Sequence, residues 1–441
     1  MNQNKRYYLE TYGCQMNIAD SEVVAAVLHD AGFTRTEQLA DAGLVLINTC
    51  AVRENAEQRI WNKLQHFKGL KKKHPHLKIG ILGCMAQRAG KAFKQSGTVD
   101  FIAGPDSYRR LPDLIQKSTT NIFASDLELS RTETYKGILP HRLYPSSVSG
   151  FVTITRGCNN FCSYCIVPYT RGRERSRHPN MVLDEINDLK QQGYKEITML
   201  GQNVNSYRHE VNGQSTGFPE LLKTAATTFP GLRIRFTTSH PKDISDALIE
   251  TMAEYNNICN HIHLPVQSGS DRVLKAMNRQ YTREWYLDRI QKIKKEIPCC
   301  GLSTDIFSGF PGETEADHRE SLSLMAQVKF DSAFMFHYSE RPGTYAAMHL
   351  MDDVPGETKI RRLNELIQLQ NKLSLESNQK EAGKVYEVLI EGKSKRSDKD
   401  VFGRTETNKL VVVPEKNCNP GSKIKVIIES YTSATLIGKP I

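Results

Sequence analysis

The sequence lacks any hydrophobic run that approaches the ~18 residues needed to cross a bilayer, so no membrane-spanning helix is expected. It also lacks the hydrophobic segment of a signal peptide after Met1. Hydrophobic residues make up 39% and charged residues 24%, which excludes a disordered or fibrous chain. We therefore expect a cytoplasmic protein without a membrane partner, and 441 residues suggest about three domains.

The charge balance shows only a modest excess of one sign. The chain has 59 Lys and Arg against 49 Asp and Glu, a formal net charge of +10. Such a balance favours polyanionic partners, with nucleic acid as the first candidate, but it fits a generally basic enzyme equally well. Charge alone does not choose between the two.

The first 125 residues alternate predicted strands with predicted helices. We expect strands over 7–13, 44–49, 78–83 and 101–104, separated by helices over 20–31, 54–72 and 87–95. This alternation is typical of an α/β domain with a parallel sheet. Residues 126–150 are polar and irregular, and we expect them to form a linker.

A cysteine directly follows each of the first three predicted strands. These residues are Cys14, Cys50 and Cys84. Because ligands bind beyond the carboxyl ends of parallel strands, three thiols that are distant in sequence are expected at one edge of the sheet. Three buried apolar cysteines are the alternative, but the repetition favours a thiolate site.

A second α/β series occupies residues 151–379. Helices are expected between its strands and over 357–379. The predicted strands are 152–156, 196–200, 233–238, 261–266, 301–307 and 332–338. Six units predict a partial (β/α)6 barrel related to the TIM barrel, with function at the carboxyl ends of its strands.

The last segment, residues 380–441, alternates apolar and polar residues in the manner of β-structure. It contains twelve Lys and Arg and eight Asp and Glu, a net charge of +4. A small basic β-barrel that binds RNA is the favoured interpretation. A structural cap with solvated lysines is the alternative.

The strongest motif is a C-x3-C-x2-C run made by Cys158, Cys162 and Cys165. Three thiolates can hold three irons of a 4Fe–4S cube, which leaves one iron open to a small chelating molecule. Zinc is the alternative metal, with a nearby His as the fourth ligand.

This run resembles that of the radical S-adenosylmethionine (SAM) enzymes, since an aromatic residue, Tyr164, precedes the last cysteine. The resemblance implies that the open iron chelates the methionine part of SAM and that Tyr164 lies near the adenine. Cleavage of SAM would then supply a 5′-deoxyadenosyl radical that abstracts hydrogen.

Three further segments, 11–17, 48–57 and 83–87, resemble the radical SAM methylthiotransferase family. That family combines an N-terminal domain with a second 4Fe–4S cluster, a radical SAM core and a C-terminal TRAM domain, and all three parts occur here in that order. The resemblance implies that Cys14, Cys50 and Cys84 hold the auxiliary cluster. It also implies that 380–441 is an RNA-binding TRAM domain, with 402–405 as one of its loops.

The form Tyr12-Gly13-Cys14-Gln15-Met16-Asn17 is similar to that of the branch that acts on tRNA. It implies methylthiolation at C2 of N6-isopentenyladenosine at position 37, in the anticodon stem-loop. One SAM would donate a methyl group to sulfur on the auxiliary cluster, and a second would supply the radical. The implied partners are this tRNA and an electron donor such as flavodoxin or ferredoxin, with the chain expected to be a monomer.

Other functions remain open from the residues. Within the family, the substrate could be threonylcarbamoyl-adenosine in tRNA or a ribosomal protein. In another class, the chain would be a zinc-stabilised RNA-binding protein without redox chemistry. The last alternative gives the six-strand core no role.

The resemblance also implies residues that contact SAM at the strand ends of the second series. They are Gly201, Gln202 and Asn203 after its second strand, Ser239 after the third and Gln267 after the fourth. Ordinary turn chemistry is the alternative for each of them.

Four alternating arginines follow the C-x3-C-x2-C run. They are Arg171, Arg173, Arg175 and Arg177. We expect them to bind RNA phosphate or to supply charge near SAM or the cluster. A solvated loop is the alternative.

Overall fold

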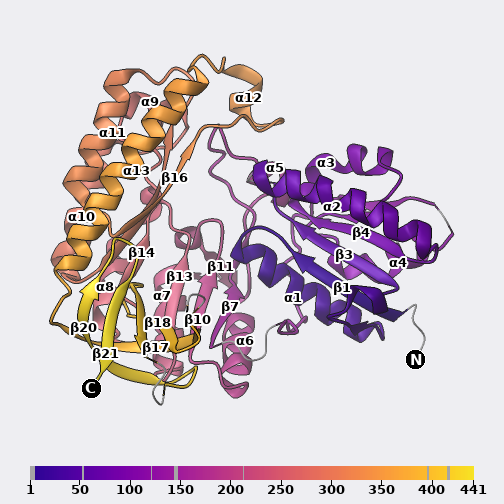
Figure 1. Ribbon diagram of the computed structural model, residues 1–441, viewed down its shortest axis with the longest axis horizontal. Coiled ribbons are helices and arrows are strands. Elements are labelled where there is room, and N and C mark those ends of the chain that lie inside the picture. Colours follow the sequence, from indigo (N-terminus) through magenta and orange to yellow (C-terminus); the bar gives the residue numbers. More distant parts are fainter. Residues whose placement is uncertain are drawn as a thin grey trace. The chain divides into compact units, whose positions relative to one another are not determined.

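The computed structural model describes residues 5–51, 54–120, 122–143, 148–211, 213–394, 397–414 and 418–441. The chain divides into two compact units (Figure 1). The first comprises residues 1–145, 153–161 and 165–185, and the second comprises 146–152, 162–164 and 186–441. The predicted domain boundaries at 125, 150 and 379 stay predictions.

The first unit is built on a six-stranded, all-parallel sheet. Parallel strands covered on both faces read as continuous apolar runs, and all six residues of the central strand Leu44–Thr49 are buried. In spatial order the strands are β2 (Thr34–Arg35), β1 (Arg6–Thr11), β3 (Leu44–Thr49), β4 (Lys78–Gly83), β5 (Phe101–Ala103) and β6 (Ala124–Asp126).

Helices cover both faces of this sheet. One buried cluster joins Leu46 to Leu28 and Leu114, and a second joins Ile81 to Phe67 and Phe93 on the opposite face. The helices are α1 (Gln15–Asp30) and α4 (Leu111–Ser118) on the first face, and α2 (Glu54–Lys73) and α3 (Cys84–Gln95) on the second. The unit also holds the 3-10 turns η2 (Leu39–Asp41) and η3 (Tyr108–Arg110).

Several elements of this unit differ from the sequence prediction, since β2 and α4 were not predicted and α3 begins at Cys84 rather than at residue 87. Helix α1 begins at Gln15 rather than at residue 20, directly after Cys14. Strand β6 lies partly in the segment expected to be a linker, because a strand of three residues leaves no periodic pattern to detect. The chain that carries the C-x3-C-x2-C run then continues through β8 (Thr155–Arg156), α5 (Val167–Arg171) and β9 (Arg175–Ser176).

The larger part of the second unit is an open series of six strands, which confirms the predicted partial barrel. They form two three-stranded sheets, and the chain after β13 bridges them through the Ser239 N–H, which donates to the His263 carbonyl over 3.3 Å. The strands, in order, are β7 (Ser149–Thr153), β10 (Glu196–Leu200), β13 (Arg233–Thr237), β14 (His261–His263), β15 (Gly301–Ser308) and β16 (Ser332–His337).

Helices follow the strands of this barrel in sequence, as the α/β alternation predicts. They are α6 (Pro179–Gln191), α7 (Phe218–Thr228), α8 (Asp246–Glu254), α9 (Asp271–Ala276), α10 (Arg283–Glu296), α11 (Glu315–Val328), α12 (Tyr345–His349) and α13 (Gly356–Gln379). A hairpin of β11 (Arg208–Val211) and β12 (Gln214–Gly217) and the 3-10 turns η4 (Val204–Ser206) and η5 (Pro241–Asp243) lie between them.

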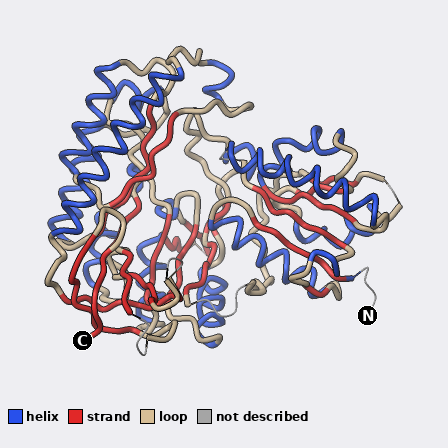
Figure 2. Tube along the Cα trace, in the orientation of Figure 1, coloured by secondary structure: helices blue, strands red, loops and turns tan. Residues whose placement is uncertain are grey.

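The C-terminal strands close into a small barrel, as predicted (Figure 2). Its core contains Val388, Val401, Val413 and Val426. Its strands are β17 (Val385–Lys393), β18 (Asp400–Arg404), β19 (Leu410–Pro414), β20 (Lys423–Tyr431) and β21 (Leu436–Pro440). In the described part of the chain, no helix is long and apolar enough to cross a membrane.

Candidate functional site

The three strand-end cysteines of the first unit follow three neighbouring strands. Cys14 follows β1, Cys50 follows β3 and Cys84 follows β4. A hydrogen bond from the Cys50 thiol, helped by the positive charge of Arg171, lowers the pKa of Cys14 to about 6. Since the thiolate is the form that binds iron, this edge of the sheet favours the ligand form of Cys14.

Glycine is required beside two of these cysteines. Gly13 has φ +132°, and a Cβ at this position would lie 2.4 Å from Cβ of Cys50. Gly83 has φ +86°, and its Cβ would lie 2.6 Å from the Thr49 carbonyl oxygen. Both values of φ disfavour any residue with a side chain, so these glycines allow the strand ends to approach one another.

Two buried asparagines hold these strand ends together. The side chain of Asn17 donates to Oδ1 of Asn48 and to the Thr49 carbonyl, both over 3.1 Å. Asn48 donates back to the Asn17 carbonyl over 2.9 Å. The Cys14 thiol donates to Oδ1 of Asn17 over 3.2 Å, so the network reaches the first cysteine itself.

A buried arginine, Arg171, contacts the third cysteine. Its Nε donates to Sγ of Cys84 over 3.1 Å, and its Nη2 lies 2.9 Å from a carboxylate oxygen of Asp20. Burial raises the pKa of Cys84, and the positive charge of Arg171 opposes that effect. Arg171 thus supplies a fixed positive charge where thiolates or a cluster would carry negative charge.

The arginines of the alternating run are largely unavailable for RNA phosphate. Arg175 pairs with Asp106 over 2.7 Å and Arg177 makes an ion pair with Glu185 over 2.6 Å, and both are buried, as is Arg171. Arg173 instead lies over the ring of Phe161, 4.3 Å from its centroid. The phosphate role is therefore wrong for the three buried arginines, whereas a charge role near a cluster site suits Arg171.

The C-x3-C-x2-C run forms the loop between β8 and α5. In the second unit, Arg279 donates to Sγ of Cys162 over 3.3 Å, to the Tyr164 hydroxyl over 3.5 Å and to the Pro265 carbonyl over 2.8 Å. Sequence reasoning missed Arg279, because it lies 117 positions from Cys162 and no motif marks it.

Ser163 fastens this loop within the second unit. Its backbone N–H donates to the Met277 carbonyl over 3.0 Å and its hydroxyl to the Ala276 carbonyl over 2.8 Å. Its own carbonyl accepts from the Ala346 N–H over 2.7 Å. Three bonds at one residue restrict the positions of the neighbouring Cys162 and Tyr164.

Three residues expected to contact SAM carry buried polar atoms that have no hydrogen-bond partner among the described residues. These atoms are Oδ1 of Asn203, Oγ of Ser239 and Oε1 of Gln267, at the carboxyl ends of β10, β13 and β14. Leaving such atoms unpaired is costly, so their presence at neighbouring strand ends fits a polar ligand.

The two other residues expected to contact SAM, Gly201 and Gln202, carry no such unpaired atom in the described part of the chain. Gly201 exchanges backbone hydrogen bonds with Thr237 and Thr238, so it continues the pairing of β10 with β13, and Gln202 beside it is partly exposed. The backbone of Gln267, with φ +70°, is held by hydrogen bonds to Asp305 and Phe307 of β15, over 2.9 Å each. Of the predicted SAM contacts, the structure therefore supports Asn203, Ser239 and Gln267 by their unpaired atoms, whereas the contacts of Gly201 are those of a sheet residue.

No group of three or more His, Cys, Asp or Glu side chains within the described ranges is arranged to hold a single metal ion. A zinc ion needs its ligands about 2.0–2.3 Å from one point. A 4Fe–4S cube binds each thiolate at a different iron, so it does not need that convergence. What the structure offers such a cube is three thiols that follow neighbouring strands, with a buried guanidinium at one of them.

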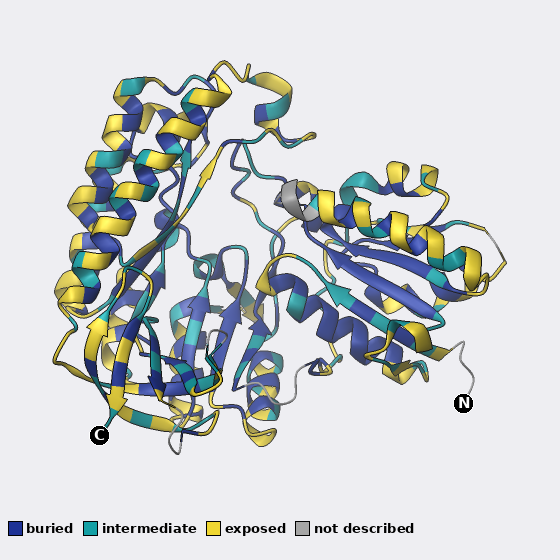
Figure 3. Cartoon of the chain, viewed as in Figure 1, coloured by how far each residue is buried: buried dark blue, intermediate teal, exposed yellow. Residues whose placement is uncertain are grey.

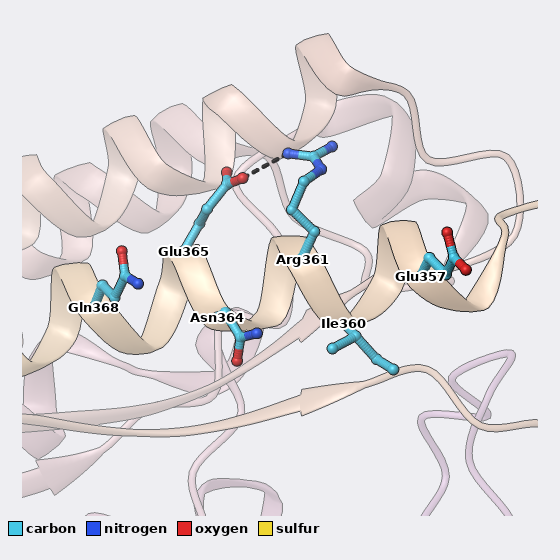
Figure 4. A pocket seen from close by; sticks show the side chains of 6 residues that line it. All are labelled: Glu357, Ile360, Arg361, Asn364, Glu365 and Gln368. Carbon is cyan, nitrogen blue, oxygen red and sulfur yellow. Dashed lines mark hydrogen bonds and ion pairs between the residues drawn. The ribbon is translucent and has the colours of Figure 1, made fainter.

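A surface hollow elsewhere lies along a single helix, α13 (Figure 4). It is lined by Glu357, Ile360, Arg361, Asn364, Glu365 and Gln368. Arg361 forms an ion pair with Glu365 one turn further on. Because one exposed helix face does not provide converging polar groups on several sides, we assign this hollow no role.

Family models match three segments of the chain. The Radical SAM superfamily matches residues 152–325, the Uncharacterized protein family UPF0004 matches 6–104, and the TRAM domain matches 379–441. The order of the three agrees with the order expected from the motifs.

Solved structures of low sequence identity share the fold. The radical S-adenosylmethionine methyltransferase TsrM from Kitasatospora setae, with cobalamin and a [4Fe-4S] cluster bound, has a TM-score of 0.59 at 14% identity, covering 78% of this chain and 77% of its own. The cobalamin-dependent radical enzyme OxsB, with aqua-cobalamin and S-adenosylmethionine bound, has a TM-score of 0.55 at 12% identity, covering 83% and 56%.

Curated relatives match over almost the full length. Proteins named tRNA-2-methylthio-N(6)-dimethylallyladenosine synthase are 56% identical in Phocaeicola vulgatus, over 100% of this chain and 96% of the relative, and 57% identical in Bacteroides fragilis, over 99% and 96%. A relative of the same name from Porphyromonas gingivalis is 53% identical over 100% of this chain and 96% of its own. The chain belongs to the radical SAM family of tRNA-2-methylthio-N(6)-dimethylallyladenosine synthases.

Proposed function

We propose that the chain methylthiolates C2 of N6-isopentenyladenosine at position 37 of tRNA, which makes it a radical SAM methylthiotransferase. The observation that carries this function is the 56% identity, over the whole chain, to a synthase named for that product. The two cysteine triads supply the thiols that the chemistry requires.

The cofactors are SAM and 4Fe–4S clusters, which supply radical hydrogen abstraction, methyl transfer and sulfur when bound. We propose that Cys158, Cys162 and Cys165 hold the SAM-binding cluster. Cys14, Cys50 and Cys84 would hold the auxiliary cluster.

The chain's own residues would bind and orient these groups. Arg171 and Arg279 each place a buried guanidinium against one thiol, that of Cys84 and that of Cys162, and would supply positive charge beside the clusters when these are bound. The carbonyl oxygens of Asn203 and Gln267 are free to accept from the SAM ammonium, and Ser239 can donate to or accept from it. Tyr164 would lie near the adenine.

The partners follow from the same function. We propose that the tRNA anticodon stem-loop is recognised with the help of the C-terminal barrel, which the TRAM model matches. A flavodoxin or ferredoxin would supply electrons. The chain would act as a monomer in the cytoplasm.

The test is iron and acid-labile sulfide per chain after anaerobic reconstitution, with about eight of each expected for two cubes. A C14A/C50A/C84A variant should keep about four of each, should still cleave SAM and should make no methylthio product. A C158A/C162A/C165A variant should keep about four and lose SAM cleavage.

Mass spectrometry of nucleosides from stem-loop RNAs identifies the substrate. Product from the isopentenyl RNA alone supports the proposal. Product only from a threonylcarbamoyl RNA or a ribosomal protein contradicts the substrate, and tight zinc without iron contradicts the chemistry. Methylthiolation by the C14A/C50A/C84A variant would contradict the auxiliary cluster.

A further inference from the structure

The register of the second three-stranded sheet defines two faces. Asp305 lies opposite Phe334, and Phe307 lies opposite Phe336, so these four side chains share one face. His263 joins them from β14, because it lies opposite Ser303, two residues before Asp305. We call His263, Asp305, Phe307, Phe334 and Phe336 the aromatic face.

Ring contacts agree with this register. The rings of His263 and Phe334 are 5.8 Å apart and edge-on, and those of Phe307 and Phe336 are 6.3 Å apart. Nε2 of His263 lies 3.5 Å from a carboxylate oxygen of Asp305. The face is therefore largely aromatic, with one carboxylate near its centre.

The other face of the sheet is covered, whereas the aromatic face is open. Thr304, Ile306 and Ser308 alternate with the aromatic-face residues of β15 and are fully buried. Phe334 is 54% exposed and Phe336 36% exposed, and strand β16 carries exposed segments in Figure 3. Contiguous exposed apolar surface marks binding sites for ligands or partners, whereas apolar residues exposed singly are ordinary.

The aromatic face continues into the candidate SAM site. The ring of Phe307 lies 5.0 Å from that of Tyr164, which precedes Cys165. The Phe307 N–H donates to the carbonyl of Gln267 over 2.9 Å. A flat ligand on this face would therefore lie beside the residues expected to hold SAM, which is where the hydrogen-abstracting radical would form.

We propose that the aromatic face binds the N6-isopentenyl-adenine of the substrate, an assignment that rests on the proposed function. The purine stacks on Phe336 or Phe334, as extruded bases commonly stack on aromatic side chains. The five-carbon isopentenyl group packs against the remaining ring surface. The carboxylate of Asp305 disfavours a threonylcarbamoyl group, because that group carries a carboxylate of its own.

The experiment compares two stem-loop RNAs that differ only in the isopentenyl group, bound to the reconstituted full chain with SAM. The wild type should bind the isopentenyl RNA more tightly. In F334A/F336A its dissociation constant should rise at least about tenfold, since loss of one base stack alone costs about fivefold or more. The preference for isopentenyl RNA should fall toward one, which a merely structural role would not cause.

Two further variants control this result. F334L/F336L keeps apolar surface but loses the rings, so it should retain part of the preference while binding both RNAs more weakly. W285A removes a 41% exposed ring from α10, outside the aromatic face, and should leave both dissociation constants unchanged. Iron content and SAM cleavage without RNA report whether each variant is folded.

The outcomes separate the two proposals. If the wild type neither prefers nor methylthiolates the isopentenyl RNA, the proposed function fails. If the wild type does both and F334A/F336A keeps the full preference, the aromatic face is not the base site. D305N should bind a threonylcarbamoyl RNA at least severalfold more tightly than the wild type does, and the absence of such a gain overturns the role of Asp305.

Discussion

Arg171 is the residue at which the buried charges of the first unit meet the thiols. It shares Asp20 with Arg156, whose Nη1 lies 2.7 Å from the same carboxylate group. Arg175 forms the corresponding ion pair with Asp106. Nε of Arg156 also lies 3.8 Å from a carboxylate oxygen of Asp106. Three guanidinium groups therefore face two carboxylates, which leaves an excess of one positive charge. Arg171 is the arginine of this group whose Nε contacts the Cys84 thiol.

The pair R171M and R175M tests this charge. Each removes a buried guanidinium but leaves its carboxylate a second arginine, so each should lower the free energy of unfolding by a similar amount, about 3 kcal/mol. R171M alone should lower the reduction potential of the auxiliary cluster, because loss of a nearby positive charge favours the oxidised state.

The measurement is an EPR-monitored redox titration in the C158A/C162A/C165A background, where one cluster remains. R175M should keep the parental potential. Equal potentials in the two variants would show that Arg171 acts only as a structural ion pair.

At the scale of elements, the outer face of the small barrel carries exposed lysines on two paired strands. Lys425 lies on β20 and Lys439 on β21, and both are exposed. Ile427 pairs directly with Lys439, so the two lysines lie on neighbouring strands of one surface. This surface is the region of 380–441 that we expect to contact RNA phosphate.

K425A/K439A should weaken tRNA binding and reduce its salt dependence. Each lost phosphate contact removes about 0.7–0.9 from the slope of log K against log salt, so a reduction of about 1.5 is expected. The measurement is the dissociation constant at several salt concentrations between about 50 and 200 mM, a range over which phosphate contacts weaken steeply. K372A, an exposed lysine on α13, serves as the control, and an unchanged slope in K425A/K439A would exclude these strands from the RNA contact.

On the scale of the second unit, the small barrel is anchored to the larger one. Arg233 donates to the carbonyls of Arg404 and Thr405 over 3.0 and 2.8 Å, and Arg235 donates to that of Thr405 over 2.7 Å. Lys409 lies 3.1 Å from a carboxylate oxygen of Asp331. The two barrels therefore share a polar contact at the start of β13 and next to β16.

Deletion of residues 380–441 should destabilise the remaining chain as well as weaken RNA binding. It removes the carbonyl partners of the buried Arg233 and the half-buried Arg235, at about 1–3 kcal/mol each, so the thermal midpoint should fall by about 5–10 °C. Calorimetry of the cluster-free chain measures this shift. K425A/K439A should not share it, and an unchanged midpoint after the deletion would contradict the anchoring.

Much of the architecture could be predicted because strands and helices leave a local hydrophobic periodicity in the sequence. The apolar run Leu44–Thr49 is a strand with the predicted bounds, and the structure contains all six strands of the second series. Two of these strands are displaced or shorter, because β7 begins at Ser149 rather than at residue 152 and β14 ends at His263 rather than at residue 266. The short strand β6 was missed, and α1 began earlier than expected, since neither a three-residue strand nor a helix start without a side-chain cap leaves a clear signal.

The residues of the candidate site could be predicted only where the chemistry requires a particular residue type at a particular spacing. The cysteine spacings and the glycines before Cys14 and Cys84 are visible in the chain, because metal ligands and left-handed turns restrict residue type. Of the two roles expected for the alternating arginines, RNA contact is wrong for Arg171, Arg175 and Arg177, which are buried, whereas charge near a cluster suits Arg171. Their surroundings depend on carboxylates at Asp20, Asp106 and Glu185, of which only the last is near them in sequence.

The sequence by itself determined the order of the three parts, the family and the thiols, because these depend on residue type and short-range spacing. Only the tertiary structure decided which arginine meets which thiol and which strand face stays open. Arg279 contacts Cys162 from 117 positions away, and Phe334 joins the aromatic face through its register with Asp305. Such pairings come from the packing of distant strands and helices, which no local pattern records.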